Sequence, residues 1–171
     1  VEGERILRRK IRYGTADMTK EPAMTREEAV RALETGIEMA EWCAAQGYQL
    51  VCGGEMGIGN TTTSAAVTAV LTGANVRDVT GRGAGLSSEG LERKVRAIET
   101  ALKLHQPDPN DPVDILHKVG GLDIAGMAGF YLGAAACGLP VVLDGVISCA
   151  AALIAVRLCP AVRDYLIAAH Q

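Results

Sequence analysis

Apolar residues recur at helical spacing soon after the start of the chain. Thr25-Arg-Glu-Glu28 fits a capping box, in which the threonine and glutamate side chains cap each other's backbone N–H groups. Gly47 ends the pattern. The sequence therefore predicts a helix from Thr25 to Gly47 with one buried stripe. The residues of that stripe are Val30, Leu33, Ile37, Ala40 and Ala44.

Two short apolar runs predict buried strands. Tyr48 to Cys52 precedes the glycine-rich segment 53–59, and Val141 to Leu143 precedes an Asp-Gly turn. A helical pattern follows each, from Asn60 to Leu71 and from about Ile147 to Leu158. Because strand–turn–helix units join parallel strands, this order predicts an open, largely parallel α/β sheet.

Further helices are predicted between these two units. Ser87 is a candidate N-cap for a helix with Leu91, Val95, Ile98 and Leu102 as its buried stripe. The segment from His105 to Pro112 is typical of a polar loop and is the best candidate for a hinge.

Small residues dominate the next helical pattern. Leu116 and Val119 suggest a brief helix, and Ile124 to Cys137 a helix with many small residues. Its glycines at 126, 129 and 133 permit close packing.

Polar cap residues at Asn60 are expected to open the helix after the first glycine-rich segment. Since no linker composition marks a boundary, residues 1–171 are expected to form a single α/β nucleotide-binding domain.

Composition and charge exclude some classes of partner. The net charge is −3, and lysine and arginine are scattered, so nucleic acid is not an expected partner. The number of cysteines is odd, and none forms a C-x-x-C pair, so we expect reduced core residues in a cytoplasmic protein. The cysteines are Cys43, Cys52, Cys137, Cys149 and Cys159.

The segment from Ile124 to Pro160 raises a membrane alternative. It carries only Asp144 and Arg157 as charges over a length that could form a helical hairpin. Gly138-Leu-Pro140 interrupts it, and the strand pattern that follows is typical of a buried parallel strand, so no membrane partner is expected. The chain opens on Val rather than Met, without a signal-peptide pattern, which suggests a cut N-terminus.

The segment Gly57-Ile-Gly59-Asn60-Thr61-Thr62 is the leading candidate for chemistry. A glycine turn between a strand and a helix exposes backbone N–H groups next to the positive end of the helix dipole, which favours phosphate. The Walker A lysine is missing, and the spacing departs from the dinucleotide fingerprint G-x-G-x-x-G. The alternative is a plain tight turn.

Two acids follow the predicted strands. Glu55 and Asp144 lie where open α/β sheets bind their ligands, so each is a candidate for ribose contact or for stabilising positive charge. Asp144 is flanked by Leu143 and Gly145 in an apolar segment and is therefore expected to need a partner, because burying an unpaired carboxylate is costly. The alternative for both acids is local capping of backbone N–H groups.

A second glycine-rich turn, Gly81-Arg-Gly-Ala-Gly85, adds another possible anion-binding wall. Lys94 lies in the helix that follows, and its position opposite Leu91 and Val95 predicts an ordinary solvated lysine. His105, His117 and His170 are far apart and lack acidic companions, so they are interpreted as structural or surface residues, with no metal site.

Several ordered motifs together resemble the phosphoribosyltransferase family that transfers ribose phosphate from nicotinate mononucleotide to 5,6-dimethylbenzimidazole, in the assembly of the lower ligand of cobamides. The resemblance covers essentially the whole chain. Its motifs are Glu21–Thr25, Gly54–Thr62, Thr80–Leu86, Lys118–Gly129 and Gly138–Gly145.

This resemblance implies a doubly wound, Rossmann-like α/β fold with a small accessory helical domain, which is mostly missing here, and a homodimer. It implies a mononucleotide site made of Glu55, Gly57, Gly59, Asn60, Thr61, Thr62, Gly83 and Lys94, with Asp144 facing the ribose or base. The substrates would be nicotinate mononucleotide and a benzimidazole. No cofactor and no metal would be required.

The resemblance also implies a mechanism and an expectation of impaired turnover. A benzimidazole nitrogen displaces nicotinate from ribose C1 with inversion, Glu55 or Asp144 stabilises the oxocarbenium-like transition state, and a general base takes the proton. Family members carry that base in a later Arg-Leu-Gly-Glu-Gly segment, which this sequence lacks. The rival hypothesis is a non-catalytic nucleotide- or phosphate-binding module.

Overall fold

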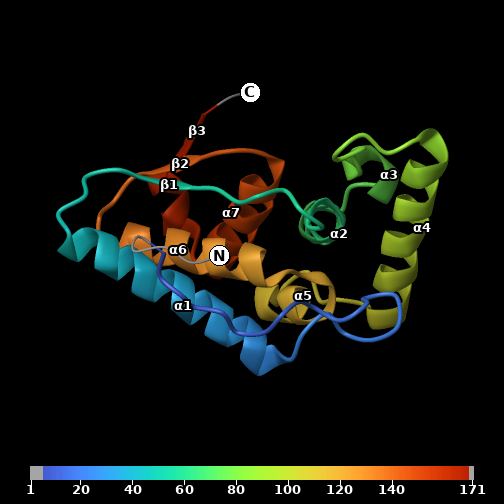
Figure 1. Cartoon of the computed structure of the whole chain (residues 1–171), viewed down its shortest axis with the longest axis horizontal. Helices are drawn as coiled ribbons and strands as arrows, with labels where there is room; N and C mark the ends of the chain where they lie inside the picture. Colours follow the sequence, from blue (N-terminus) through green and yellow to red (C-terminus); the bar gives the residue numbers. More distant parts are fainter. Residues whose placement is uncertain (1–5, 170–171) are drawn as a thin grey trace.

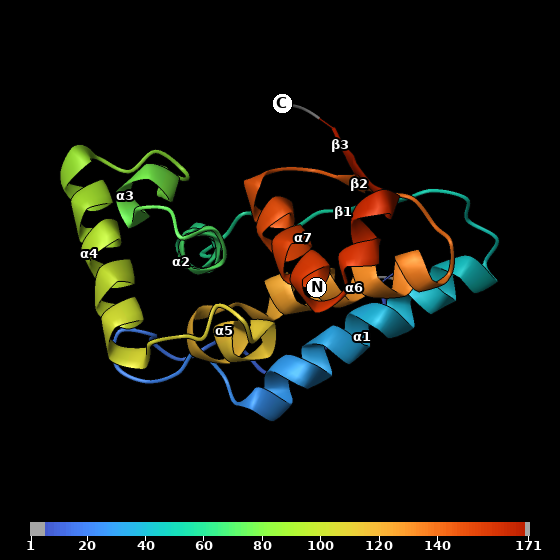
Figure 2. The ribbon, with the colours of Figure 1, turned by 180° about the vertical axis from the view of Figure 1, so that it is seen from behind.

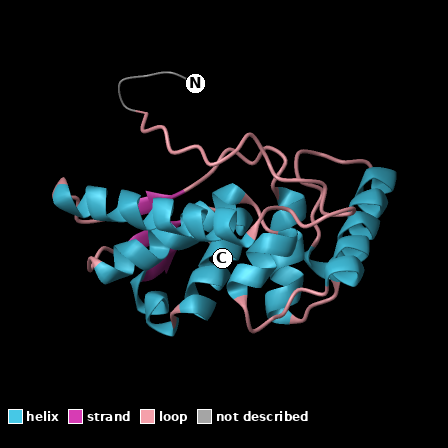
Figure 3. Ribbon diagram, turned by 90° about the horizontal axis from the view of Figure 1, so that it is seen from below, coloured by secondary structure: helices cyan, strands magenta, loops and turns pink. Residues whose placement is uncertain are grey.

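The computed structural model describes residues 6–169. Its elements, in chain order, are α1 (Arg26–Ala45), β1 (Val51–Gly53), α2 (Thr61–Thr72), α3 (Val76–Val79), α4 (Ser88–His105), α5 (Pro112–Val119), α6 (Leu122–Ala136), β2 (Val141–Leu143), α7 (Val146–Leu158), the 3-10 helix η1 (Pro160–Tyr165) and β3 (Leu166–Ala168). Figure 3 shows how small the strand portion is.

The described strands form one parallel sheet in the order β1-β2-β3. Val141 pairs with Val51 on one side and with Leu166 on the other. Helices α1 and α6 run side by side beneath the sheet, while α3 and α4 stand at the far end of the molecule (Figures 1 and 2). The predicted α/β class, with a parallel sheet and flanking helices, is confirmed.

Helix α1 begins as the sequence predicts. The Thr25 hydroxyl accepts the Glu28 N–H at 3.1 Å, and the Glu28 carboxylate accepts the Thr25 N–H at 2.8 Å. Gly47, with φ +80°, follows the end of the helix. The predicted stripe is wrong in part, because Val30 is 38% exposed. The buried face consists of Ala29, Ala32, Leu33, Gly36 and Ala40.

The buried face of α1 is shifted because α6 approaches it very closely. A Cβ added to Gly129 would lie 1.9 Å from the Leu33 carbonyl oxygen, and one added to Gly36 would lie 1.9 Å from the Gly126 carbonyl oxygen. At Gly133 the Ala40 Cβ would be 2.9 Å away. The two backbones are in contact, so small residues are selected over large apolar ones.

Strand β2 matches its prediction, whereas β1 is displaced. Tyr48 and Leu50 are 51% and 52% exposed, so they belong to the connection before the buried strand. The sequence did not predict β3 or α3. Helices α5, α6 and α7 begin within a few residues of their expected positions.

The prediction of core cysteines is wrong. Cys52, Cys137, Cys149 and Cys159 are exposed, and Cys43 is partly buried. Burial raises the pKa of the Cys43 thiol. All five thiols are unpaired in the structure. No helix within residues 6–169 is long and apolar enough to cross a membrane.

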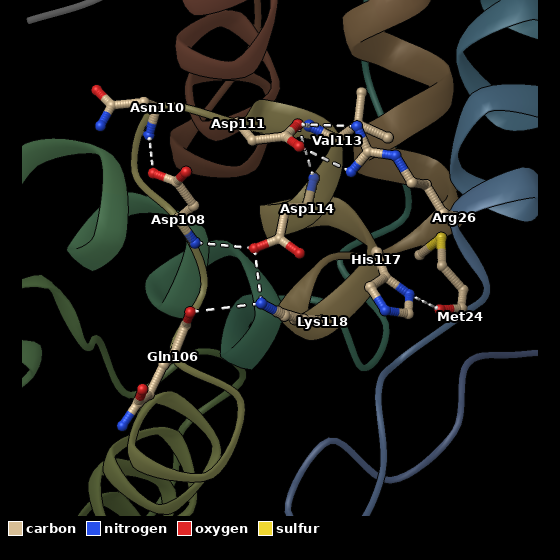
Figure 4. Close-up of polar contacts among 10 residues, drawn as sticks. All are labelled: Met24, Arg26, Gln106, Asp108, Asn110, Asp111, Val113, Asp114, His117 and Lys118. Carbon is tan, nitrogen blue, oxygen red and sulfur yellow. Dashed lines mark hydrogen bonds and ion pairs between the residues drawn. The ribbon is translucent and has the colours of Figure 1, made fainter.

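The connection from α4 to α5 ties the N-terminal segment to the core (Figure 4). Asp111 caps α5 through the Val113 and Asp114 N–H groups and pairs with Arg26 at 2.8 Å. A ring nitrogen of His117 contacts the Met24 carbonyl oxygen.

The histidines with described positions have structural contacts, as predicted. The Nε2 atom of His105 lies 2.8 Å from the Met18 carbonyl oxygen, and His117 holds Met24 in the same manner. His170 lies outside the described residues. Within the described chain, no group of three or more His, Cys, Asp or Glu side chains is arranged to hold a metal.

Candidate functional site

The loop between β1 and α2 is folded around Glu55. Gly57 and Gly59 have φ of +72° and +76°, a backbone region that favours glycine. The Glu55 carboxylate accepts the Gly57 N–H and, at 2.6 Å, a hydrogen from the Asn60 side-chain amide. Local capping, which the sequence left as an alternative for Glu55, is therefore what this carboxylate does in the described loop.

A cavity of about 290 Å³ separates this loop from the second glycine-rich turn. It is lined by Gly57, Gly59, Thr61, Thr62, Arg82, Gly83, Ala84, Gly85, Leu86 and Lys94, and we call it the cationic cavity. The structure thus brings together six of the seven predicted binding residues. The seventh, Asn60, lines a neighbouring cavity.

Lys94 is one of the two cationic residues, with Arg82, that line the cationic cavity. Its Nζ atom donates to the Thr61 hydroxyl at 2.8 Å and to the Gly81 carbonyl oxygen at 3.0 Å. Only 7% of the residue is exposed, and no carboxylate among residues 6–169 forms an ion pair with it. Burial lowers the pKa of the Lys94 ammonium.

The solvated lysine predicted from position is therefore wrong. Helix α4 turns Lys94 toward α2 together with the buried Val95 and Ile98, whereas Leu91 on the expected face is only partly buried. A buried ammonium with only neutral partners is poorly compensated. An anion in the cavity would compensate it.

Gly83 allows the second turn to approach this ammonium. Its φ is +56°, and an added Cβ would lie 3.0 Å from the Thr61 hydroxyl oxygen and 3.8 Å from the Lys94 Nζ. Arg82 closes the turn by donating to the Leu86 carbonyl oxygen at 2.7 Å. The turn is held beside the start of α2.

The start of α2 lacks the side-chain cap that the sequence predicts. Asn60 occupies the N-cap position, but its side chain makes no capping hydrogen bond. The first intrahelical N–H donated to the Asn60 carbonyl oxygen is that of Ser64, so the preceding N–H groups have no intrahelical acceptor. Because Thr61 and Thr62 line the cationic cavity, its wall includes the positive end of a 12-residue helix.

Asp144 lies at the same sheet edge but is exposed. Strand register pairs Gly53 with Leu143, so the next residues, Gly54 and Asp144, are neighbours. A Cβ added to Gly54 would lie 3.8 Å from an Asp144 carboxylate oxygen. The predicted need of Asp144 for a partner is wrong, because its carboxylate lies after the apolar strand and is exposed to solvent. Neither acid lines the cationic cavity.

Sequence reasoning missed Asp123 as a residue of the site. Its carboxylate accepts a hydrogen from the Asn60 side-chain amide at 2.6 Å. Both residues line a second cavity of about 350 Å³, together with Thr15, Thr63 and Gly121. A signal was present in the sequence, since Asp123 follows a Gly-Gly pair and opens a helix.

Comparison with known proteins shows which chains this one is similar to. A family model described as "Phosphoribosyltransferase" matches residues 1–171. A Geobacter metallireducens protein named nicotinate-nucleotide–dimethylbenzimidazole phosphoribosyltransferase is 55% identical over 166 residues, which are 97% of this chain and 47% of the relative. A protein of the same name from Acetivibrio thermocellus is 52% identical, over 98% of this chain and 48% of the relative.

A solved structure is similar as well. The crystal structure of CobT from Thermus thermophilus matches with a TM-score of 0.92 and 44% sequence identity, over 99% of this chain and 51% of that chain. The chain spans about half the length of the curated relatives it matches. With the family model covering residues 1–171, the chain belongs to the phosphoribosyltransferase family.

Proposed function

We propose that these residues form the donor-binding part of a nicotinate-mononucleotide:5,6-dimethylbenzimidazole phosphoribosyltransferase. The observation that carries the proposal is the Lys94 ammonium, buried without a carboxylate partner among the described residues at a glycine-lined cavity. The names of the curated relatives support the choice of donor and acceptor.

The phosphate of the donor would occupy the cationic cavity. Lys94 supplies the charge, the open N–H groups at the start of α2 supply directed donors, and Thr61 and Thr62 supply hydroxyls. Gly57, Gly59 and Gly83 let the backbone approach the phosphate oxygens. The ribose would then extend toward Glu55, at the carboxyl end of β1.

The reaction would be displacement of nicotinate from ribose C1. The benzimidazole nitrogen forms the new bond to C1 while the bond to the nicotinate ring nitrogen breaks, and that nitrogen recovers the electron pair. In this proposal, Glu55 or Asp144 would stabilise the positive charge that develops on the ribose. A general base must take the benzimidazole proton, and turnover by residues 1–171 alone is predicted to be impaired because they do not include the family's Arg-Leu-Gly-Glu-Gly segment.

Calorimetric titration with nicotinate mononucleotide tests the proposal. We expect saturable binding to the wild-type chain and an affinity at least about tenfold lower for Lys94→Met, because a hydrogen bond to a charged group is lost. Lys103→Met is the matched control, since Lys103 lies on the same helix and is exposed. Equal affinity of Lys94→Met and the wild type would contradict the proposal.

A turnover assay separates the proposed enzyme from its rival. Release of α-ribazole phosphate from the mononucleotide and dimethylbenzimidazole would support transfer. Binding without product would favour the non-catalytic nucleotide-binding module. The homodimer implied by the family resemblance stays a prediction.

A further inference from the structure

Asn60 lies between two carboxylates that come from distant parts of the chain. Its side-chain nitrogen donates at 2.6 Å to Glu55 and at 2.6 Å to Asp123. Glu55 is in the loop before α2, whereas Asp123 is in the first turn of α6. Asn60 is 7% exposed, whereas Glu55 is partly buried and Asp123 is exposed, so the two hydrogen bonds are partly buried.

This orientation of the Asn60 amide has two unfavourable consequences for folding. Its Oδ1 atom is buried and has no hydrogen-bond partner among the described residues. In addition, asparagine is a favoured N-cap, and its Oδ1 would normally accept an N–H group of the first helical turn. Here that cap is not made. Unsatisfied buried polar atoms are rare in native proteins, so this one calls for a functional explanation.

The Asp123 carboxylate lies beside the start of α6. A Cβ added to Gly121 would lie 2.6 Å from an Asp123 carboxylate oxygen, so a larger residue at position 121 would require the Asp123 side chain to shift. Gly121 is the N-cap residue of α6 and makes no side-chain cap. The carboxylate therefore sits at the positive end of α6 while it reaches across to Asn60.

We propose that Asp123 is a positioning residue of the donor site. By accepting one hydrogen of the Asn60 amide, it holds that amide away from the start of α2 and aims the other hydrogen at Glu55. Two properties follow: the Glu55 carboxylate keeps a fixed orientation, and the first N–H groups of α2 stay open to an anion. The inference rests on the proposed function, because the anion it concerns is the donor phosphate.

Two substitutions at Asp123 separate positioning from charge. Asp123→Asn and Asp123→Ala remove the same charge, but only asparagine keeps an oxygen that can accept the Asn60 hydrogen. In Asp123→Ala the Asn60 amide is released and can rotate to cap α2. We expect the dissociation constant for nicotinate mononucleotide to rise about tenfold in Asp123→Ala and to stay within about threefold of wild type in Asp123→Asn.

Nuclear magnetic resonance reports directly whether Asp123 fixes the Asn60 amide, and it is read beside the difference in affinity between Asp123→Asn and Asp123→Ala. In the wild type and Asp123→Asn, both hydrogens of the Asn60 side-chain amide should exchange slowly with water and give two well-separated signals. In Asp123→Ala, exchange should accelerate and the two signals should converge. If Asp123→Ala does not fold, Asp123→Ser replaces it, because its shorter hydroxyl does not reach Asn60.

The outcomes distinguish this inference from the proposed function. A wild-type chain that fails to bind the mononucleotide contradicts the proposed function. A wild-type chain that binds, with Asp123→Ala binding equally well, contradicts positioning alone. Equal losses in Asp123→Ala and Asp123→Asn would assign the effect to charge and likewise overturn positioning.

Discussion

The burial of one lysine determines how the candidate site should respond to pH. Desolvation disfavours the ammonium form of Lys94, so its pKa in the folded chain lies below the usual 10.5. At pH values between the lowered pKa of the folded chain and 10.5, Lys94 binds fewer protons in the folded chain than in the unfolded chain. The contribution of Lys94 to the free energy of unfolding therefore rises with pH across that interval.

Binding of an anion should depend on pH in the opposite direction. The ammonium attracts phosphate only while it is protonated, so affinity for nicotinate mononucleotide should fall as pH rises through the lowered pKa of Lys94. Calorimetric titrations from neutral pH to about pH 10 would measure this decline. In Lys94→Met the decline should be absent, and an equally steep decline in that variant would assign it to another group.

Residue identity alone gave an incomplete account of the site. The glycines and threonines of segment 57–62 were predicted from their types and order, and the structure places them on one cavity. Its helical position wrongly predicted that Lys94 is solvated, whereas the family resemblance grouped it with the glycine-rich segment, and both line the same cavity. The burial of Lys94 depends on contacts with Thr61 and Gly81, which are distant along the chain and carry no helical periodicity.

At the scale of elements, the contact between α1 and α6 makes a sharp prediction. Gly129→Ala should lower the free energy of unfolding by about 3 kcal/mol, because its Cβ would meet the Leu33 carbonyl oxygen at 1.9 Å and the backbones must separate. Chemical denaturation measures the change.

Gly126→Ala is a control on the same helix. Its Cβ would meet its nearest neighbour, the Ala32 carbonyl oxygen, at 3.9 Å. We expect an increase of about 0.5–1 kcal/mol in the free energy of unfolding, from reduced backbone entropy in the unfolded chain. Similar losses of unfolding free energy in both variants would show that the close approach of the two helices is not what excludes a larger residue at position 129.

The cap of α5 gives a second prediction at this scale. Asp111→Ala removes the acceptor of two backbone N–H groups and the ion pair with Arg26, so we expect a loss of about 1–2 kcal/mol near neutral pH. Arg26 holds the pKa of Asp111 below its usual 3.8, so this advantage is present above that pH. It should disappear as pH falls through the lowered pKa.

Urea denaturation at neutral and acidic pH would measure both effects. Asp164→Ala is the control, because Asp164 and its partner Arg163 have side chains 75% and 80% exposed. That pair should contribute little. A loss in Asp111→Ala that persisted at acid pH would show that the charge of the carboxylate is not responsible.

Helices and strands that carry a sequence pattern within their own residues were predictable. Those defined only by contacts with distant parts of the chain were not. The capping box marked the start of α1, and the apolar run from Val141 to Leu143 marked β2. Strand β3 has only three residues, and its central Ile167 is 48% exposed, so neither length nor alternation distinguishes it. Pairing with β2, a long-range contact, defines it.

For the molecule as a whole, the sequence predicted the fold class but not the small share of residues that lie in strands. Two strand–turn–helix units correctly indicated a parallel sheet, yet each described strand has only three residues. The core is therefore built mainly from helices, and α6 contributes its largest buried side chain, Tyr131. The phenol is fully buried, which raises its pKa to about 12.

The cationic cavity has one further property, which concerns how its lining residues are ordered along the chain. All of its lining residues lie between Gly57 and Lys94, in one continuous stretch of chain. Asp123, in contrast, reaches Asn60 from outside that stretch. The proposed anion-binding wall is therefore encoded by one continuous segment, whereas its link to α6 depends on a contact that is distant along the chain.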